Sequence, residues 1–349
     1  MKRVIVFGAY GVFGGHVTRE LAKRGVPLTV AGRDRAKAEA FALAFGADCR
    51  ACVADVTKTE SCRAALAEHE VAVNCAGPFN RLGTGLLDAS LDAGCHYVDI
   101  ADDRGYCATV RGYDQRFRDK NLAAVYGCSS LPGISAALAL RAMEGATAAV
   151  ERVSVTLFIG NKNPKGRAAV GSLVSQLGQP IAAPQGELLG FRDREVVLLP
   201  SPFGRRAVFN VQSPEYDLFP PLLGAKSVSV KVGFESRLGT YAFAALARVG
   251  LRYGGRAATL LKLPGRLIGW YGHSGGVVMT ELFLADGSVR RAAVGGPDDG
   301  QRMAALPCAI VAHALATGNI HRTGASTAYE FLGAGPLLDA LVSAGFAMS

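Results

Sequence analysis

Acidic residues are missing from one long stretch of this 349-residue chain, and that absence accounts for most of its positive charge. Between Glu235 and Glu281 there is no Asp or Glu but there are six Lys or Arg residues, while the whole chain has a net charge of +9. The rest of the chain is therefore close to balanced. Because a basic nucleic-acid-binding domain would be charged more broadly, we expect no nucleic-acid partner.

Long apolar runs and paired cysteine motifs are also lacking. No run of about 18 apolar residues occurs, so we expect no membrane-spanning helix. The run Val4–Phe7 ends at a glycine-rich turn, which favours a buried strand over a signal peptide. Cys49 and Cys52 have metal-site spacing, but on a strand they face opposite sides and no second pair exists, so we expect no metal. The eight unevenly spaced cysteines fit a reducing, cytoplasmic location.

The first 31 residues predict the start of a dinucleotide-binding unit. A glycine turn follows the strand Val4–Phe7, a helix is expected over His16–Arg24, and a second strand over Leu28–Ala31. In this setting the first glycine allows a tight turn, the second lets a pyrophosphate approach, and the third lets the helix pack closely. The alternative is an ordinary glycine turn. The loop residues expected to contact the cofactor are Gly8, Ala9, Tyr10, Gly11, Val12, Phe13 and Gly14.

The residue after the second strand indicates which dinucleotide binds. NAD-binding proteins place an acid there, on the ribose 2′-hydroxyl, about 20 residues after the glycines. This chain has Arg33 instead, and a guanidinium pairs with a 2′-phosphate. We therefore predict NADP(H). The alternative is that Arg33 merely ends the strand in water and Asp34 binds the ribose.

Strands and helices continue to alternate as far as residue 126, which predicts an α/β fold. Further strands are expected over residues 48–53, 71–76, 96–100 and 122–126. They imply a doubly wound parallel Rossmann sheet, whose ligands lie at the C-terminal strand ends. Asp55 would either bind the adenine amino group or cap the next helix. The residues at these ends that we expect to contact the cofactor are Asp55, Val56, Ala76, Gly77, Pro78, Phe79 and Ser130.

Residues 150–300 predict a second, α+β domain. Alternating apolar residues indicate strands over 151–159, 196–199, 206–211 and 227–234, and Asp286-Gly287 predicts a hairpin between 277–284 and 288–294. We expect an open antiparallel sheet with helices on one face, whose free face covers the active site or forms a homodimer. Residues 237–271, with helix-like stretches at 242–249 and 257–263, either touch a membrane or acyl chain or form two ordinary amphipathic helices; we favour the second interpretation.

Several motifs together resemble the saccharopine dehydrogenase-like oxidoreductases. They are Gly8-x-x-Gly11-x-x-Gly14, Ala31-Gly-Arg33, Asn74-Cys-Ala-Gly-Pro-Phe79, Cys95-His-Tyr-Val-Asp99 and Ser130-Leu-Pro-Gly-Ile134. The resemblance is good over residues 1–135, fair over the tail and poor over 150–300. It implies an NADP-binding Rossmann domain (residues 1–131 with 302–349) interrupted by a substrate-binding or dimerisation domain (132–301). The family's lipid-linked enoyl reductases have a glycine-phenylalanine-aspartate-serine run where this chain reads Gly127–Gly133, which weighs against their substrate.

Candidate catalytic residues are few. Tyr97 and Asp99 are two apart on one strand and face the same side, so we expect Asp99 and Asp102 to bind a substrate amine and Tyr97 to donate a proton. We interpret His96 as packed in the core, and we expect the same of the cysteines near strand ends, Cys75, Cys95 and Cys128.

These observations predict an NADP(H)-dependent oxidoreductase that moves hydride to or from a C=N, C=C or C=O bond of a small molecule. The alternatives are a lipid-linked reductase of the enoyl type and a non-catalytic NADP-binding sensor or scaffold.

Overall fold

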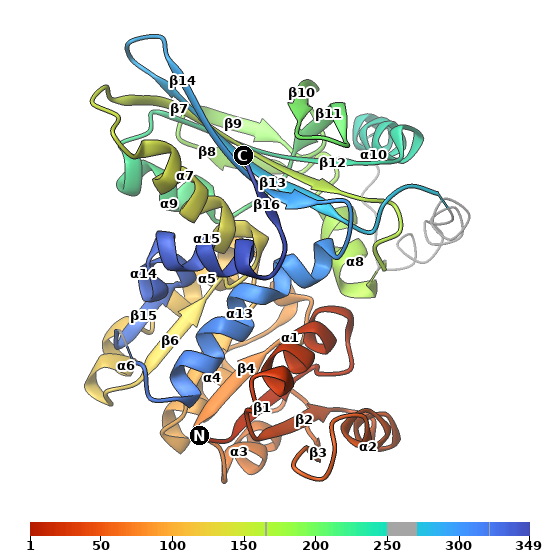
Figure 1. Cartoon of the computed structure of the whole chain (residues 1–349), viewed down its shortest axis with the longest axis vertical. Coiled ribbons are helices and arrows are strands. Elements are labelled where there is room, and N and C mark those ends of the chain that lie inside the picture. The colour runs from red at the N-terminus through yellow and green to blue at the C-terminus, as the bar shows by residue number, and fades with distance from the viewer. Residues whose placement is uncertain (165, 250–270, 321) are drawn as a thin grey trace. The chain divides into compact units, whose positions relative to one another are not determined.

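The short apolar runs of the first 130 residues form one parallel sheet, as predicted (Figure 1). The computed structural model describes residues 1–164, 166–249, 271–320 and 322–349. The seven strands lie in the order β15-β6-β5-β4-β1-β2-β3 and every neighbouring pair is parallel. Their bounds are β1 (Val4–Phe7), β2 (Leu28–Gly32), β3 (Arg50–Val53), β4 (Val71–Asn74), β5 (His96–Asp99), β6 (Ala123–Tyr126) and β15 (Gly324–Thr327).

Burial explains why most residues of these strands are apolar. All residues of β1, β2, β4, β5, β6 and β15 are buried, whereas β3 at the sheet edge is mostly exposed. Strand order reverses between β1 and β4, and right-handed connections then place helices on opposite faces of the sheet. The helices of this part are α1 (Val12–Lys23), α2 (Arg35–Leu43), α3 (Thr59–Leu66), α4 (Gly85–Ala93), α5 (Arg104–Arg111), α6 (Asp114–Asp119), α13 (Gly300–Ala316) and α14 (Ala328–Leu332).

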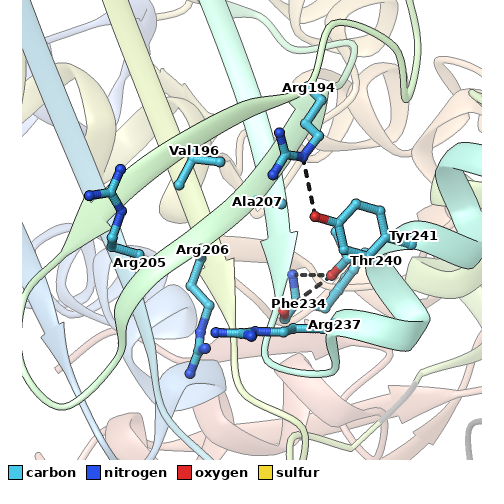
Figure 2. A pocket seen from close by; sticks show the side chains of 9 residues that line it. All are labelled: Arg194, Val196, Arg205, Arg206, Ala207, Phe234, Arg237, Thr240 and Tyr241. Atoms are coloured by element: carbon cyan, nitrogen blue, oxygen red, sulfur yellow. Dashed lines mark hydrogen bonds between the residues drawn. The ribbon is translucent and has the colours of Figure 1, made fainter.

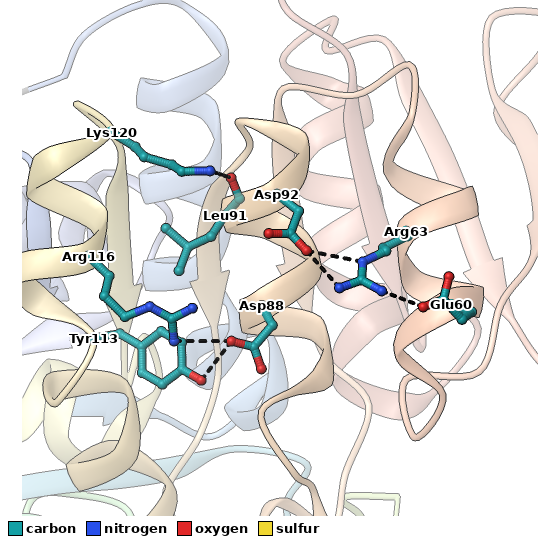
Figure 3. A network of polar contacts seen from close by, with 8 residues as sticks. All are labelled: Glu60, Arg63, Asp88, Leu91, Asp92, Tyr113, Arg116 and Lys120. Atoms are coloured by element: carbon teal, nitrogen blue, oxygen red, sulfur yellow. Dashed lines mark hydrogen bonds and ion pairs between the residues drawn. The ribbon is translucent and has the colours of Figure 1, made fainter.

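Polar contacts join α3, α4 and α6 at the surface of this unit (Figure 3). Arg63 Nη2 of α3 lies 2.8 Å from Asp92 Oδ2 of α4. Asp88, also on α4, accepts hydrogen bonds from the Tyr113 hydroxyl at 2.9 Å and from Arg116 Nη1 at 3.1 Å. The Arg63 side chain is 45% exposed, so its ion pairs contribute little to stability and mainly orient the helices.

The chain divides into two compact units. The first contains residues Met1–Ser129 and Ala304–Gly333, and the second contains Ser130–Met303 and Ala334–Ser349. The sequence analysis grouped all of 302–349 with the first unit. Residues 334–349 instead join the second, because α15 (Ala334–Ser343) packs on α7 (Ser135–Met143) and β16 (Ala347–Met348) pairs with β14. The functional names that we gave to the two domains stay predictions.

The second unit is built on a mixed seven-stranded sheet. Its strands lie in the order β10-β11-β12-β7-β13-β14-β16. The expected antiparallel pairing is wrong for β7 and β12, which run parallel. Between them the chain passes through α8 (Arg167–Ser175), two hairpins and α9 (Glu215–Leu223), a crossover long enough to restore the strand direction. The bounds are β7 (Val150–Ile159), β8 (Pro180–Ala183), β9 (Gly186–Leu189), β10 (Glu195–Leu199), β11 (Gly204–Asn210), β12 (Ser227–Phe234), β13 (Gly276–Leu284) and β14 (Val289–Gly296).

The hairpin predicted at Asp286-Gly287 is confirmed, since β13 and β14 pair antiparallel and Gly287 has a φ of +82°. An apolar cluster of this unit contains Phe158, Val197, Leu199, Phe203, Val208, Val277, Met279 and Ala293. The helix expected over 242–249 is longer than predicted, α10 (Arg237–Val249), whereas the stretch 257–263 lies outside the described residues. Within the described parts of the chain, no helix is both long and apolar enough to cross a bilayer.

Candidate cofactor site and its surroundings

The glycine loop after β1 has the close backbone contacts that the sequence predicts. Gly8 has a φ of +75°, and a Cβ there would lie 3.0 Å from backbone atoms of Cys75 and Ala76. A Cβ on Gly14 would lie 2.2 Å from the Gly8 carbonyl oxygen, so only glycine fits. Ala9 between them is fully buried.

Helix α1 begins at Val12, inside the loop and earlier than the predicted His16. Its N-cap residue, Gly11, has no side chain to bond the first amide groups, and the first turn contains no acid. The N–H groups of a first turn have no partner within their own helix. The exposed start of α1, including the half-buried Val12 and Phe13, is therefore free to bind an anion such as a pyrophosphate.

Tyr10 lies over the end of β2. A Cβ on Gly32 would approach the Tyr10 ring to 2.4 Å, and the Asp34 backbone N–H donates to the Tyr10 hydroxyl at 3.0 Å. The Tyr10 ring therefore packs against the strand end that carries Arg33.

Arg33 and Asp34 differ in how far their side chains are already engaged. The Asp34 carboxylate accepts from the Lys37 backbone N–H at 3.1 Å and lies 2.8 Å from Lys37 Nζ. Both contacts hold its pKa below the usual value. The side chain of Arg33 is exposed and forms no ion pair or hydrogen bond with the described residues. The geometry thus favours Arg33 as a ligand of a 2′-phosphate over Asp34 as a ligand of the ribose.

The carboxylate of Asp55 accepts local hydrogen bonds but does not cap helix α3. Helix α3 begins at Thr59 with Lys58 as its N-cap residue, so the predicted capping of the next helix does not occur. The carboxylate accepts from the Thr57 hydroxyl at 2.8 Å and from the Thr57 N–H at 3.0 Å, and these bonds lower its pKa. The turn that they form places Asp55 and the half-buried Val56 just beyond the end of β3.

A buried polar cluster lies under the end of β4. Asn74 Nδ2 donates to the Tyr97 hydroxyl at 3.1 Å, and the hydroxyls of Tyr97 and Tyr106 are 2.8 Å apart. Asn74 Oδ1 accepts from the Ala76 N–H at 3.1 Å. Phe79 covers the cluster, with its ring centroid 5.1 Å from that of Tyr106. The cluster thus fixes the segment Ala76–Phe79, in which Gly77 is exposed and Pro78 is half-buried.

Tyr97 is part of this cluster, and its position argues against the predicted role as proton donor. The side chain is fully buried, and burial, together with the charge of Asp99, raises its pKa well above the ordinary value. Its hydroxyl is occupied by Asn74 and Tyr106. The alternation of side chains along the strand correctly placed Tyr97 and Asp99 on one side, but it did not reveal that this side is buried away from solvent.

Asp99 fastens the end of β5 to the end of β6. Its Oδ1 accepts from the Ala101 N–H at 3.0 Å and from the Gly127 N–H at 2.9 Å. Its Oδ2 is buried and has no hydrogen-bond partner among the described residues. Burial raises the pKa of this carboxyl to about 6, although the two backbone N–H groups oppose the shift. In this structure Asp99 positions backbone and does not face an open surface.

His96 and the cysteines pack as expected. His96 is 4% exposed, and its Nδ1 accepts from the Ala123 N–H at 3.0 Å. Burial lowers the pKa of His96 to about 4. Cys95 and Cys128 are fully buried, and Cys75 is partly exposed.

Asp102 and Ser130 complete the predicted set. Asp102 is exposed just before α5, where water screens its carboxylate. The surrounding protein and the charge of Asp103 raise its pKa to about 6, although solvent reaches the side chain. Ser130 is buried and is the first residue of the second unit.

Comparisons with known proteins agree with this geometry. Residues 4–125 match the family model of the saccharopine dehydrogenase NADP binding domain. The chain resembles the saccharopine dehydrogenase-like oxidoreductases. The proteins of that name from Homo sapiens and Bos taurus are 28% and 27% identical to it over 170 residues, which cover 42% of this chain and 39% of each relative. The chain thus matches only about two fifths of the length of these curated relatives.

A solved structure extends the likeness in fold. Apo saccharopine dehydrogenase (L-Glu forming) from Saccharomyces cerevisiae has a TM-score of 0.69 and covers 100% of this chain and 99% of its own, at 12% identity. This identity supports the fold alone. The saccharopine dehydrogenase resemblance, the Rossmann fold and the NADP-binding domain are confirmed by these matches, whereas the individual contact residues, Arg33 included, stay predictions.

Three residues of the site escaped the sequence analysis. Asn74 and Tyr106 form the buried cluster, and Cys308 of α13 lies beside Cys75. Asn74 is the first residue of the motif Asn74-Cys-Ala-Gly-Pro-Phe79. The one sign of its role in the sequence was that a polar residue ends an apolar strand. Tyr106 and Cys308 come from other elements, so spacing along the chain gave no sign of them.

Proposed function

We propose that this protein transfers hydride between NADP(H) and a carbon of a C=N, C=C or C=O bond in a small substrate. One observation supports this most strongly. The exposed, unengaged Arg33 stands at the end of β2, beside a helix α1 whose start has neither a side-chain cap nor an acid. This pairing of features suits a dinucleotide that carries an additional phosphate.

The chain's own residues would bind and orient the cofactor. The first turn of α1 holds the pyrophosphate, Gly11 lets it approach, and Arg33 pairs with the 2′-phosphate. Asp55 and Val56 border the adenine, and the segment Ala76–Phe79 supports the nicotinamide end. When bound, NADPH supplies the hydride, and the protein supplies position, electrostatics and exclusion of water.

Substrate contacts belong to the same proposal. Asp102 is exposed and negatively charged at neutral pH, which suits a cationic substrate group such as an amine. Asp99 is a positioning residue that holds Gly127 and Ala101. A homodimer stays an expectation.

A reductase would oxidise NADPH when it meets its substrate, whereas a non-catalytic sensor would not. The buried hydroxyl of Tyr97 removes one predicted proton donor, which favours the non-catalytic sensor as the second candidate. Oxidation of NADPH in the presence of a panel of imines, enones and ketones separates the two, because a sensor oxidises none of them. Nothing in the described residues specifically favours a lipid-linked substrate.

Arg33→Gln tests the cofactor assignment, with Arg35→Gln as the matched control. Arg35 is also exposed but pairs with Glu39 at 3.5 Å on α2. A charge-assisted bond to a phosphate contributes about 1.5–3 kcal/mol, so Arg33→Gln should weaken NADPH binding roughly 10–100-fold and leave NADH binding nearly unchanged. Equal weakening of both nucleotides, or an equal effect of Arg35→Gln, would contradict the role of Arg33.

A further inference from the structure

The second unit contains a pocket of about 260 Å³ that the function proposed above does not use. Strands β10, β11 and β12 and the first turns of α10 surround it (Figure 2). Four of its lining residues are arginines and none is acidic. The complete lining is Arg194, Val196, Arg205, Arg206, Ala207, Phe234, Arg237, Thr240 and Tyr241.

No carboxylate neutralises these arginines. None of the four forms an ion pair with the described residues, and the remaining residues of the chain, 165, 250–270 and 321, include no Asp or Glu. The three acids nearest to them in sequence are engaged elsewhere. Asp193 Oδ2 accepts from Asn210 Nδ2 at 2.7 Å, Glu195 lies 2.9 Å from Lys231 Nζ, and Glu235 accepts from the His273 N–H at 2.7 Å. The pocket therefore concentrates positive charge without a counter-charge, which is unfavourable unless an anion binds.

Two of the four arginines contact aromatic side chains that help to position them. Arg194 Nε donates to the Tyr241 hydroxyl at 3.2 Å, and Arg206 lies 5.7 Å from the centre of the Phe158 ring. The Nε atom of Arg206 is buried and has no hydrogen-bond partner in the described chain. Figure 2 shows the side chains of Arg206 and Arg237 extending toward the same part of the pocket. Positioned cations with unused donors are typical of binding sites.

The start of α10 is also fixed, and it adds positive potential. Thr240 Oγ1 accepts from the Phe234 N–H at 3.2 Å and donates to the Ser236 carbonyl at 3.0 Å. Ser236 Oγ accepts from the Gly239 N–H at 3.0 Å. These bonds anchor the first turn, which begins at Arg237, and a helix N-terminus carries about half a positive charge.

We propose that this pocket binds a small molecule through a phosphate or diphosphate group. Guanidinium forks that come from β11, from the residue before β10 and from the start of α10 can meet the oxygens of a tetrahedral anion from several sides, whereas a single planar carboxylate engages one fork. The volume lies just under the range of about 300–1,000 Å³ that is usual for pockets that hold drug-sized ligands, so a compact polyanion fits better than a dinucleotide. The proposal does not depend on the cofactor or the reaction.

Calorimetric titration of the full chain with inorganic diphosphate tests this site. We expect saturable binding that weakens as ionic strength rises. Arg237→Gln, an exposed position whose side chain has no ion pair among the described residues, should weaken binding about tenfold or more, and Arg206→Gln with Arg237→Gln should weaken it further. Thermal unfolding of each variant would verify that it folds.

Competition with NADPH is the decisive control, because free diphosphate also fits the start of α1 in the first unit. The proposal requires that saturating NADPH leave the diphosphate affinity unchanged. Loss of diphosphate binding in the presence of NADPH but not in Arg237→Gln would overturn it, as would the absence of saturable binding. Sedimentation with phosphatidylcholine vesicles that contain phosphatidic acid, without any binding of free diphosphate, would assign the arginines to a membrane surface and would likewise overturn it.

Discussion

Substitution of Asp99 by asparagine should change how the stability of the protein depends on pH. The carboxyl is fully buried, and its pKa is raised from 3.8 to about 6 in the folded chain. The folded state therefore holds this proton more tightly than the unfolded state does. The stabilisation from this proton is complete below pH 3.8 and is lost as pH rises through about 6.

The magnitude follows from the two pKa values. A difference of one pKa unit corresponds to about 1.4 kcal/mol, so Asp99 accounts for about 3 kcal/mol in all, of which about 2 kcal/mol develops between pH 6 and pH 4. His96 acts in the opposite direction. Its pKa is lowered from 6.5 to about 4, so its stabilisation is complete above pH 6.5 and is lost as pH falls through about 4, again by about 3 kcal/mol. The two effects nearly cancel in the native chain.

Urea unfolding at several pH values between 4 and 6 measures this balance. Because other groups titrate equally in both proteins, the difference between the curves isolates Asp99. Asp99→Asn should lose about 2 kcal/mol more than the native chain as pH falls from 6 to 4. His96→Asn should show the reverse trend. Parallel curves for Asp99→Asn and the native chain would mean that Asp99 titrates as if in water, and the reasoning from burial would fail.

Three substitutions test the packing described here. Gly14→Ala places a Cβ 2.2 Å from the Gly8 carbonyl oxygen and should abolish nucleotide binding or destabilise the chain. In Gly15→Ala the nearest atom to the new Cβ is the flexible end of Arg19 at 3.2 Å, so this substitution should be tolerated. Nucleotide titration and thermal unfolding compare the two variants, and similar behaviour would contradict the loop geometry. Arg63→Ala should cost about 1 kcal/mol or less by urea unfolding, since its ion pairs are exposed, and a loss of several kcal/mol would show that they are not. Thr327→Ala removes a capping box with Glu330 and should cost about 1 kcal/mol, and no loss of stability would contradict that role.

The strands were predictable because their residues carry a strong local pattern. Runs such as Val4–Phe7 are short, apolar and bounded by turns, and Asp286-Gly287 specifies a hairpin through local geometry. The parallel pairing of β7 with β12 was not predictable, because strand direction depends on the path of the intervening crossover. The early start of α1 was missed because Val12 to Gly14 belong to the glycine motif, which the pattern assigned to a turn.

The residues of the candidate site also differ in whether the sequence alone could identify them. Arg33 and the glycine loop act through their position in a strand–turn–helix unit, so sequence spacing identified them. Whether Tyr97 faces a cleft or a closed cluster depends on Tyr106 from the next helix, which spacing does not show. The arginine pocket gathers residues from β10, β11 and α10, and only the acid-free stretch after Glu235 hinted at it.

Parallel fluorescence titration of the native chain with NADPH and NADH tests the central claim most directly. If Arg33 pairs with the 2′-phosphate, which NADH lacks, NADPH should bind at least about tenfold more tightly than NADH. Equal binding of the two nucleotides, or binding of neither, would contradict the assignment of the glycine loop and Arg33 as an NADP(H) site.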